Sequence, residues 1–513
     1  MGASTSSEQK VSKEQEEVES LAASTGALPM LQKAFSKLAD PEQNSVPIEK
    51  LQQCFSLTYE RSIDEALKLP DAFTALLDHL ASSIVEQFFV TGKGGVTWVE
   101  FVRGYNNCCG RMTASLSLNR LFRVFTATVR KANMPCKLEF ESDDADCKIS
   151  GSFLPIDVLM LLWMCWTMSW KCTSLKSLAG KAILSTPDVN HLVLSAIISC
   201  AKPDSGLNCW DIDISSLEVQ IPVGPFITWV LATLPRLPEC LTHFFHARLQ
   251  TSDTVTDELT SPNSSAGHVS STTTCDSNLL TRGRAWAISL TLRSTMSEEI
   301  LRACFLINGD GMHENLLYRS SIHGRGLNRF WSNIEGYRGP LLILVAAGSG
   351  DSHVGGNGIR KWIVVFHVFS SIGKEKNFVY SHLHPTGRVY EPHPKPVGIS
   401  FGGSVGNERI SIDEDFGIVT VRHHAVDKTY QPGSLFPDQG FLPVEALISE
   451  VEVWGLGGRG AKEVQNSHKK REELFTEQRR RIDLKTFANW EDSPEKMMMN
   501  MISDPNAVRR EER

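Results

Sequence analysis

The sequence lacks the features that mark several common classes of protein. Its twelve cysteines include no Cys-x-x-Cys pair, so a zinc-finger type of metal cluster is not indicated, and a disulfide framework is not expected in a chain of 513 residues. The most apolar stretch, Val158–Trp170, is shorter than the about 20 residues of a membrane-spanning helix. Acidic residues outnumber basic ones by 59 to 52, which argues against a nucleic-acid-binding surface. We therefore expect a cytosolic protein with reduced, mostly buried thiols.

The composition that is present is typical of folded soluble domains. Hydrophobic residues make up 41% of the chain and charged residues 22%, so the chain can bury substantial cores. The length allows two or three domains. Changes in pattern along the chain predict an α+β protein, in which a mainly α-helical N-terminal region is joined by a flexible linker to a β-rich domain. A charged helical tail over residues 459–513 completes the prediction.

The chain opens with a pattern for lipid modification. Gly2 follows Met1, and Ser6 supplies the hydroxyl that N-myristoylation patterns require. The following residues, including those from Glu8 to Glu19, are not polybasic. Because one myristoyl chain gives only marginal and reversible membrane binding, we expect peripheral membrane contact only where a partner helps to hold the protein. The rest of residues 1–28 is polar, and we expect it to be disordered.

Apolar residues recur at helical spacing over residues 29–249. Leu31, Phe35 and Leu38 form one stripe, and residues 73, 76, 77 and 80 form another. A start signal, Ser185–Asp188, precedes a further apolar run and combines capping side chains with a proline. These patterns predict a mainly helical region.

One segment of this region is similar to a calcium-binding EF-hand loop. Counting twelve residues from Phe89 places Gly94 at position 6, Val96 at position 8 and Glu100 at position 12, as in such a loop. Phe89 itself and Lys93 then occupy ligand positions 1 and 5, where a calcium ion needs oxygen atoms. We therefore predict a degenerate helix-loop-helix that serves packing.

A second twelve-residue window starts at Asp146. It places Gly151 at position 6, Phe153 at position 8 and Asp157 at position 12, but Lys148 stands at ligand position 3. Too few carboxylates remain for a strong calcium site, and a plain acidic turn is the simpler interpretation. A calcium-responsive membrane adaptor that uses this window is kept as one alternative function.

The character of the chain changes at residues 250–278, which are rich in serine and threonine and poor in large apolar residues. Such a segment cannot offset its ordering entropy by burial, so we predict a flexible linker. After it, Trp286–Leu292 alternates like a strand, Ser297–Phe305 has helical spacing, and Pro340–Ala346 is a short apolar run typical of a buried strand.

Residues 279–458 resemble the TLDc domain family. The resemblance is carried by five segments in the family's order: Asn315–Gly324 with Leu327–Phe330, Gly339–Val345, Gly398–Gly403, Ile410–Phe416 and Ile448–Gly455. It implies a β-sandwich-like domain with flanking helices. The layout with a helical, EF-hand-like N-terminal region is similar to that of plant members, of the fungal restriction-of-telomere-capping protein and of the animal lysosomal member.

The resemblance also implies which residues are family positions and what the protein does. The structural family positions are Leu317, Tyr318, His323, Gly324, Phe330, Gly402, Gly403, Asp413, Glu452, Trp454 and Gly455. The implied role is a non-catalytic regulator that binds subunits of the vacuolar proton-pumping ATPase and is linked to oxidative-stress resistance. Binding would use sheet edges and loops, and myristate on Gly2 would favour the vacuolar or endolysosomal surface. No cofactor is implied.

The chain departs from the family pattern in one place. Family members carry an additional aromatic strand and turn between the central strand and a later one, whereas here Arg360–Ser370 runs almost directly into Asn377–Ser381. A missing central strand would leave ladder groups unpaired. We therefore expect a sheet that is short by a strand or hairpin.

An enzyme of peroxide or hydrolytic chemistry is the other alternative. His382 and His384 would lie on one face of a strand, but no carboxylate or cysteine stands at a recognisable ligand spacing. Glu450 and Glu452 also share one strand face, where carboxylates can act as acid and base, although a solvated face is the commoner arrangement. We predict no metal site and no catalytic residue.

Overall fold

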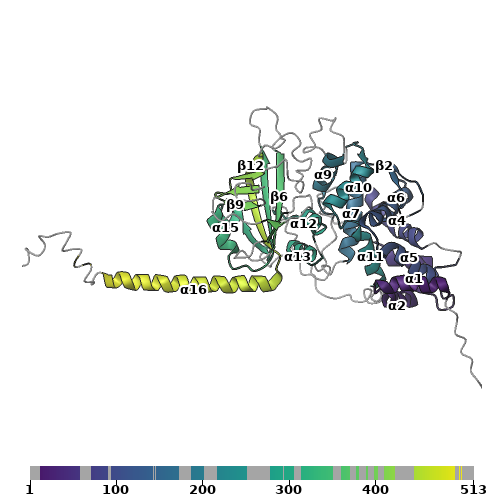
Figure 1. The fold of residues 1–513 in the computed structure, drawn as a ribbon, viewed down its shortest axis with the longest axis horizontal. Coiled ribbons are helices and arrows are strands. Elements are labelled where there is room, and N and C mark those ends of the chain that lie inside the picture. The colour runs from purple at the N-terminus through teal and green to yellow at the C-terminus, as the bar shows by residue number, and fades with distance from the viewer. Residues whose placement is uncertain are drawn as a thin grey trace, which may run out of the picture.

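The computed structural model of the chain describes residues 12–57, 71–89, 94–142, 144, 146–172, 186–200, 217–250, 278–292, 294–305, 313–349, 360–369, 377–380, 389–390, 398–401, 410–421, 444–490, 496 and 498. The fold is α+β, with a helical N-terminal region and a large sheet in the C-terminal region (Figure 1). This arrangement confirms the predicted fold class.

The N-terminal region consists of helices and one small sheet. The helices are α1 (Lys13–Ser24), α2 (Leu28–Leu38), α3 (Ile48–Phe55), α4 (Asp71–Phe88), α5 (Trp98–Cys109), α6 (Ala114–Lys131), α7 (Pro155–Cys172), α9 (Asn190–Cys200), α10 (Val223–Thr233) and α11 (Glu239–Gln250). The sheet has the order β1 (Leu138–Phe140), β2 (Ile149–Phe153), β3 (Ile221–Pro222).

The predicted apolar stripes form the core of this region. Leu31 and Phe35 are buried on α2, and all four stripe residues on α4 are buried. The most apolar stretch of the sequence forms α7, whose residues 158–168 are buried on every side of the helix. Of the predicted start signal at Ser185–Asp188, Ser185 lies outside the described residues. The Asp188 carboxylate accepts the backbone N–H of Asn190, where α9 begins.

Helix α1 lies in the segment that we expected to be disordered. Ser12 caps its N-terminus by accepting the backbone N–H of Gln15, and Ala22 on its inner face is fully buried. Glu19 accepts the indole N–H of Trp98 on α5 at 2.6 Å. Contacts to a distant helix therefore order a stretch that is polar in sequence and gives little signal by itself.

At two places in the N-terminal region, backbone pairing joins segments that precede different helices. Val46, before α3, and Val96, before α5, form an antiparallel bridge in which each backbone N–H bonds the other residue's carbonyl at 2.8 Å. In the second pair, Phe153 on β2 lies opposite Ile221 on β3. The residues at position 8 of the two predicted loops, Val96 and Phe153, therefore each pair with a residue that lies just before another helix.

The C-terminal region is built on a sheet whose described strand pairs are all antiparallel. Its strands are β4 (Leu316–Arg319), β5 (Leu341–Ser349), β6 (Arg360–Phe369), β7 (Asn377–Tyr380), β8 (Val389–Tyr390), β9 (Gly398–Phe401), β10 (Ile410–Asp413), β11 (Ile418–Val421) and β12 (Val444–Gly455). The order is β8-β7-β6-β5-β12-β11-β10-β9, and β4 also pairs with β12. Helices α12 (Arg282–Ser289), α13 (Ser294–Phe305), α14 (Ser320–His323), α15 (Leu327–Ile334) and α16 (Gly458–Trp490) accompany it.

The expected gap in the sheet is not present. Strand β6 pairs with β5 from Leu341 opposite Val368 to Ser349 opposite Arg360, and its other edge pairs with β7. The short connection therefore joins neighbouring strands directly. Strand β6 is therefore paired on both edges, and the unpaired ladder that we expected is not found among these described strands.

Residues 286–292 were predicted as a strand, but most of them belong to helix α12. Thr281 caps this helix by accepting the backbone N–H of Arg284. Every residue from Ala285 to Leu290 is buried, so apolar residues occur on all sides and the sequence shows no helical stripe. Alternation in such a short buried segment does not distinguish a strand from a helix.

Helix α12 connects the two regions through direct packing. Trp286 is 1% exposed and lies edge-on to Trp166 of α7, with ring centroids 5.8 Å apart. Arg236 donates its backbone N–H to the carbonyl of Leu290 and a guanidinium N–H to that of Leu292. Leu342 and Trp454 of the sheet belong to the same continuous core. The helical region and the sheet are therefore packed together and not only linked by the chain.

We expect Gly283→Ala to weaken this connection. A Cβ atom at residue 283 would lie 1.9 Å from the backbone carbonyl oxygen of Asp188, so one of the two segments must move. Overpacking of this kind costs about 1–3 kcal/mol of unfolding free energy, to be measured by chemical denaturation. Gly224→Ala is the matched control, because nothing lies within 4 Å of its Cβ position in α10. Equal stability of both variants would contradict the expectation.

Candidate functional site

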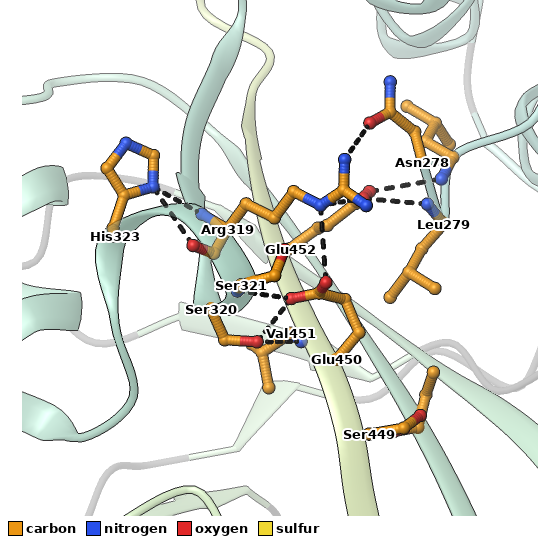
Figure 2. Close-up of polar contacts among 12 residues, drawn as sticks. Asn278, Leu279, Arg319, Ser320, Ser321, His323, Ser449, Glu450, Val451 and Glu452 are labelled. Atoms are coloured by element: carbon orange, nitrogen blue, oxygen red, sulfur yellow. Dashed lines mark hydrogen bonds and ion pairs between the residues drawn. The ribbon is translucent and has the colours of Figure 1, made fainter. Parts of the chain in front are cut away.

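A buried carboxylate lies where the chain re-enters the fold after the serine- and threonine-rich segment. Glu452, on β12, has no exposed surface. Its oxygens accept the backbone N–H of Leu279 at 2.8 Å (Figure 2). They also accept the backbone N–H of Leu280 at 3.2 Å and the indole N–H of Trp454 at 3.0 Å. One side chain therefore holds the start of the α12 segment against a central strand of the sheet.

Arg319, at the end of β4, supplies the positive charge of this cluster. Its Nε lies 3.4 Å from Glu450 and 3.7 Å from Glu452, and its Nη1 donates to the side-chain oxygen of Asn278 at 2.7 Å (Figure 2). The Arg319 side chain is only 13% exposed. Removal of one partner from such a largely buried ion pair is costly, because the remaining charge is left without compensation.

The second carboxylate, Glu450, is held by helix α14. It accepts the hydroxyl of Ser320 and, at 2.9 Å, the backbone N–H of Ser321. Burial by itself would raise the pKa of Glu450, but the hydrogen bonds from Ser320 and Ser321 and the charge of Arg319 outweigh it and lower the pKa. For Glu452 burial dominates and raises the pKa, against the hydrogen bonds and Arg319.

The prediction of a solvated face for Glu450 and Glu452 was therefore wrong. Strand β12 is paired on both edges, by β5 on one side and by β4 and β11 on the other. Its polar residues face the segment at Asn278–Leu280 and the guanidinium of Arg319 (Figure 2). Alternation of glutamate and valine predicts a polar strand face. It does not indicate whether that face is exposed to solvent or is covered by a segment distant in sequence.

Two aromatic family positions, Tyr318 and Phe330, lie together with Phe416 on the opposite side of β4. Tyr318 is fully buried and donates its hydroxyl to the carbonyl oxygen of Gly324 at 2.8 Å, and burial raises its pKa to about 12. The rings of Phe330 and Phe416 lie edge-on to Tyr318 at 5.5 and 6.1 Å. Gly324 has φ +86°, which explains why a glycine ends the short helix α14.

The remaining family positions have structural roles or lie elsewhere. Leu317 is buried in the core of the sheet, and the Asp413 carboxylate accepts the backbone N–H groups of Gly417 and Ile418, which closes the β10–β11 turn. At Gly455, a Cβ atom would meet the Tyr337 ring at 2.6 Å. The predicted positions Gly2, Gly402 and Gly403, and the histidines His382 and His384, lie outside the described residues.

The polar side chains of this site do not line up for nucleophilic catalysis. The Ser320 hydroxyl donates to the carboxylate of Glu450. The Nδ1 atom of His323 accepts the backbone N–H of Arg319, with 2.9 Å between the two nitrogen atoms. The sequence also contains a Gly-x-Ser-x-Gly pattern at Gly398–Gly402. Ser400 of this pattern lies within strand β9, paired with Ser411, and not at a strand-to-helix turn. Within the described part of the chain, no three His, Cys, Asp or Glu side chains gather to hold a metal ion.

Both carboxylates at position 12 of the predicted loops cap helices. Glu100 accepts the backbone N–H of Thr97 at 2.8 Å and forms a capping box at the start of α5. Asp157 accepts the backbone N–H of Leu154 at 2.9 Å, at the start of α7. In the second window, residues 149–151 pair with residues 138–140 of β1, so its backbone belongs to a hairpin and not to an open calcium loop.

The comparison with protein families decides the nature of the C-terminal region. Residues 291–457 match the family model described as the TLDc domain. The chain contains a TLDc domain. No curated protein matches the chain as a whole or in part. The match ends two residues after Gly455 and covers the sheet, so the Glu452 cluster joins the TLDc domain to the segment that precedes it.

We expect Glu452→Gln to destabilise the TLDc domain. An amide in this position offers one oxygen to three N–H groups and turns its own NH₂ group towards one of them. An unsatisfied buried donor costs about 1–3 kcal/mol of unfolding free energy. The control is Glu445→Gln, on the same strand but exposed, which should change stability by less than about 0.5 kcal/mol. Denaturation curves that coincide for the two variants would refute the assigned role.

Glu450 gives the TLDc domain a defined acid dependence. Its folded-state pKa is lowered from the ordinary 4.5, so its contribution to stability is complete above 4.5 and is lost as the pH falls through the lower folded pKa. We expect Glu450→Gln to be less stable than the wild type at neutral pH but to lose less of its stability on acidification. Unfolding curves measured between neutral pH and pH 3 test this. Parallel acid profiles of the two proteins would contradict it.

Proposed function

We propose that this chain is a non-catalytic regulator that acts by binding a protein partner, and that the partner is the vacuolar proton-pumping ATPase. Two observations support the proposal. The chain contains a TLDc domain, and the resemblance to that family implies such a partner. In addition, α16 continues directly from the last strand of the domain and projects away from the rest of the molecule (Figure 1). The projecting helix is the observation that carries the proposal.

The base of α16 is fixed to the TLDc domain by specific contacts. Gln465 is 1% exposed and donates its amide N–H to the carbonyl oxygens of Asn333 and Glu335, at the end of α15. The Tyr337 hydroxyl accepts the backbone N–H of Gly457 at 2.7 Å. These contacts set the direction in which the helix leaves the domain, so a bound partner would be held in a defined orientation.

The outer part of α16 presents apolar side chains to solvent. Every residue from Lys470 to Arg481 is exposed, and Leu474 and Phe475 keep 58% and 66% of their surface accessible. Most of the neighbouring residues are charged, and Glu477 pairs with Arg481 at 2.6 Å along the helix. Two adjacent large apolar side chains on an otherwise charged helix suit the edge of a protein interface, in which aromatic residues commonly act as anchors.

Membrane attachment is part of the same proposal. Myristate on Gly2 would add weak, reversible affinity for the vacuolar or endolysosomal surface, and binding to the ATPase would supply the second contact that stable attachment needs. Among the described helices, none is both long and apolar enough to cross a membrane. The proposed link to oxidative-stress resistance would follow from control of proton pumping.

Affinity capture of the full-length protein from membrane extracts tests the proposal. We expect subunits of the peripheral sector of the ATPase to be recovered, and recovery to fall at least severalfold with the double variant Leu474→Lys, Phe475→Lys. Both side chains are exposed, so the variant should keep the wild-type melting temperature. Absence of ATPase subunits from wild-type captures under stabilising conditions would refute the proposed partner.

The control variant is Leu447→Lys, which changes an exposed apolar residue on the sheet. Leu447 is 68% exposed and lies opposite Ile418 on β11. If α16 is the contact, this variant should be captured like the wild type. A loss of binding that is confined to Leu447→Lys would instead place the contact on the sheet, as the family resemblance first implied, and would refute the role of the helix.

A further inference from the structure

Two cysteines that are far apart in sequence face each other inside the helical region. Cys165 lies on α7 and Cys240 in the first turn of α11, and the Cys240 sulfur lies 3.2 Å from the hydroxyl oxygen of Ser169, which follows Cys165 by one turn on the same face of α7. Helices α7 and α11 lie side by side (Figure 1). All ten cysteines that the structure describes are free thiols. We infer that Cys165 and Cys240 form a dithiol site that peroxide converts into a disulfide between α7 and α11.

The surroundings favour Cys240 as the reacting thiol. Ser169, one turn after Cys165 on α7, donates its hydroxyl to the Cys240 sulfur at 3.2 Å. The first turn of a helix favours a thiolate because its backbone N–H groups are unpaired. Hydrogen bonds from Cys165 and Ser169 lower the pKa of Cys240, whereas burial raises that of Cys165. Cys240 also keeps 4% of its surface exposed, and Cys165 none.

The chemistry balances with hydrogen peroxide as the oxidant. The Cys240 thiolate attacks one peroxide oxygen, the O–O bond breaks, and after proton uptake the products are a sulfenic acid and one water. The Cys165 thiol then attacks the Cys240 sulfur, the S–O bond breaks, and a second water leaves as the disulfide forms. Two electrons pass from the two thiols to one peroxide molecule, and no other reactant is required.

Three other described cysteines differ from this pair. Cys200, on α9, is buried, and burial raises its pKa to about 12. Cys108 and Cys109 are neighbours in sequence on α5, and burial raises the pKa of Cys108. A bridge between adjacent residues of one helix would require a distorted backbone. Cys165 and Cys240 lie instead on two neighbouring helices, so a bridge between them would join α7 to α11.

Peroxide treatment of the reduced full-length protein tests the inference. After alkylation of free thiols and digestion without reductant, we expect mass spectrometry to find a Cys165–Cys240 cross-linked peptide, with Cys200 still alkylated. The wild type should melt at a higher temperature after oxidation. Cys165→Ser should give no cross-link and should accumulate a sulfenic acid at Cys240 that a cyclic 1,3-dione labels. Ser169→Ala should form the cross-link severalfold more slowly.

Cys200→Ser is the matched control, since it removes a buried thiol outside the pair and should leave the cross-link and its rate unchanged. Recovery of Cys165 and Cys240 as alkylated thiols, under conditions that oxidise other cysteines of the wild type, would overturn the inference. So would a cross-link that forms only above the melting temperature. The wild-type experiment is decisive by itself if a variant fails to fold.

Discussion

The contact between the Glu452 carboxylate and the backbone of Leu279 and Leu280 is the constraint on which the arrangement of the two regions depends. It fixes the first residues after the serine- and threonine-rich segment to β12, which is paired on both edges. Helix α12 begins two residues later and is buried among α7, the sheet and the loop before α9. Chain connectivity constrains the two regions little by itself, because the cost of loop closure grows slowly with loop length. The core shared by the helical region and the sheet therefore depends on the attachment of Leu279 and Leu280 to β12.

A carboxylate is suited to this task despite the cost of burying it. Three N–H groups converge on Glu452, and Arg319 lies beside it, so its charge is hydrogen-bonded and paired as a buried charge must be. An apolar residue would leave the backbone N–H groups of Leu279 and Leu280 without acceptors. Arg319 in turn binds Glu450, which holds helix α14 and with it the turn that positions Tyr318. The charged cluster around Arg319 and the aromatic cluster around Tyr318 therefore lie on opposite faces of the short strand β4.

Local patterns predicted several elements, and tertiary contacts explain the failures. Helices α2, α4 and α16 show their character in the spacing of apolar or charged residues, and β5 in its continuous apolar run. Helix α12 was missed because it is buried on all sides and carries no periodic signal. Glu452 could be assigned as a family position, but not as a buried residue, because its partners at Leu279 and Leu280 are more than 170 positions away. Pairing of β6 with both neighbours likewise depends on backbone geometry that residue types do not encode.

In the helical region, the carboxylates that the sequence placed at position 12 of two calcium-loop-like windows have a structural role. Calcium loops use the carboxylate at position 12 as a bidentate ligand, but Glu100 and Asp157 each hold backbone N–H groups at a helix start. Backbone pairing joins the segments before these helices, between Val46 and Val96 and between Phe153 and Ile221. Capping and packing fix the starts of α5 and α7, and α11 contacts both helices. The position of Cys240 beside α7 therefore depends on the packing of these three helices.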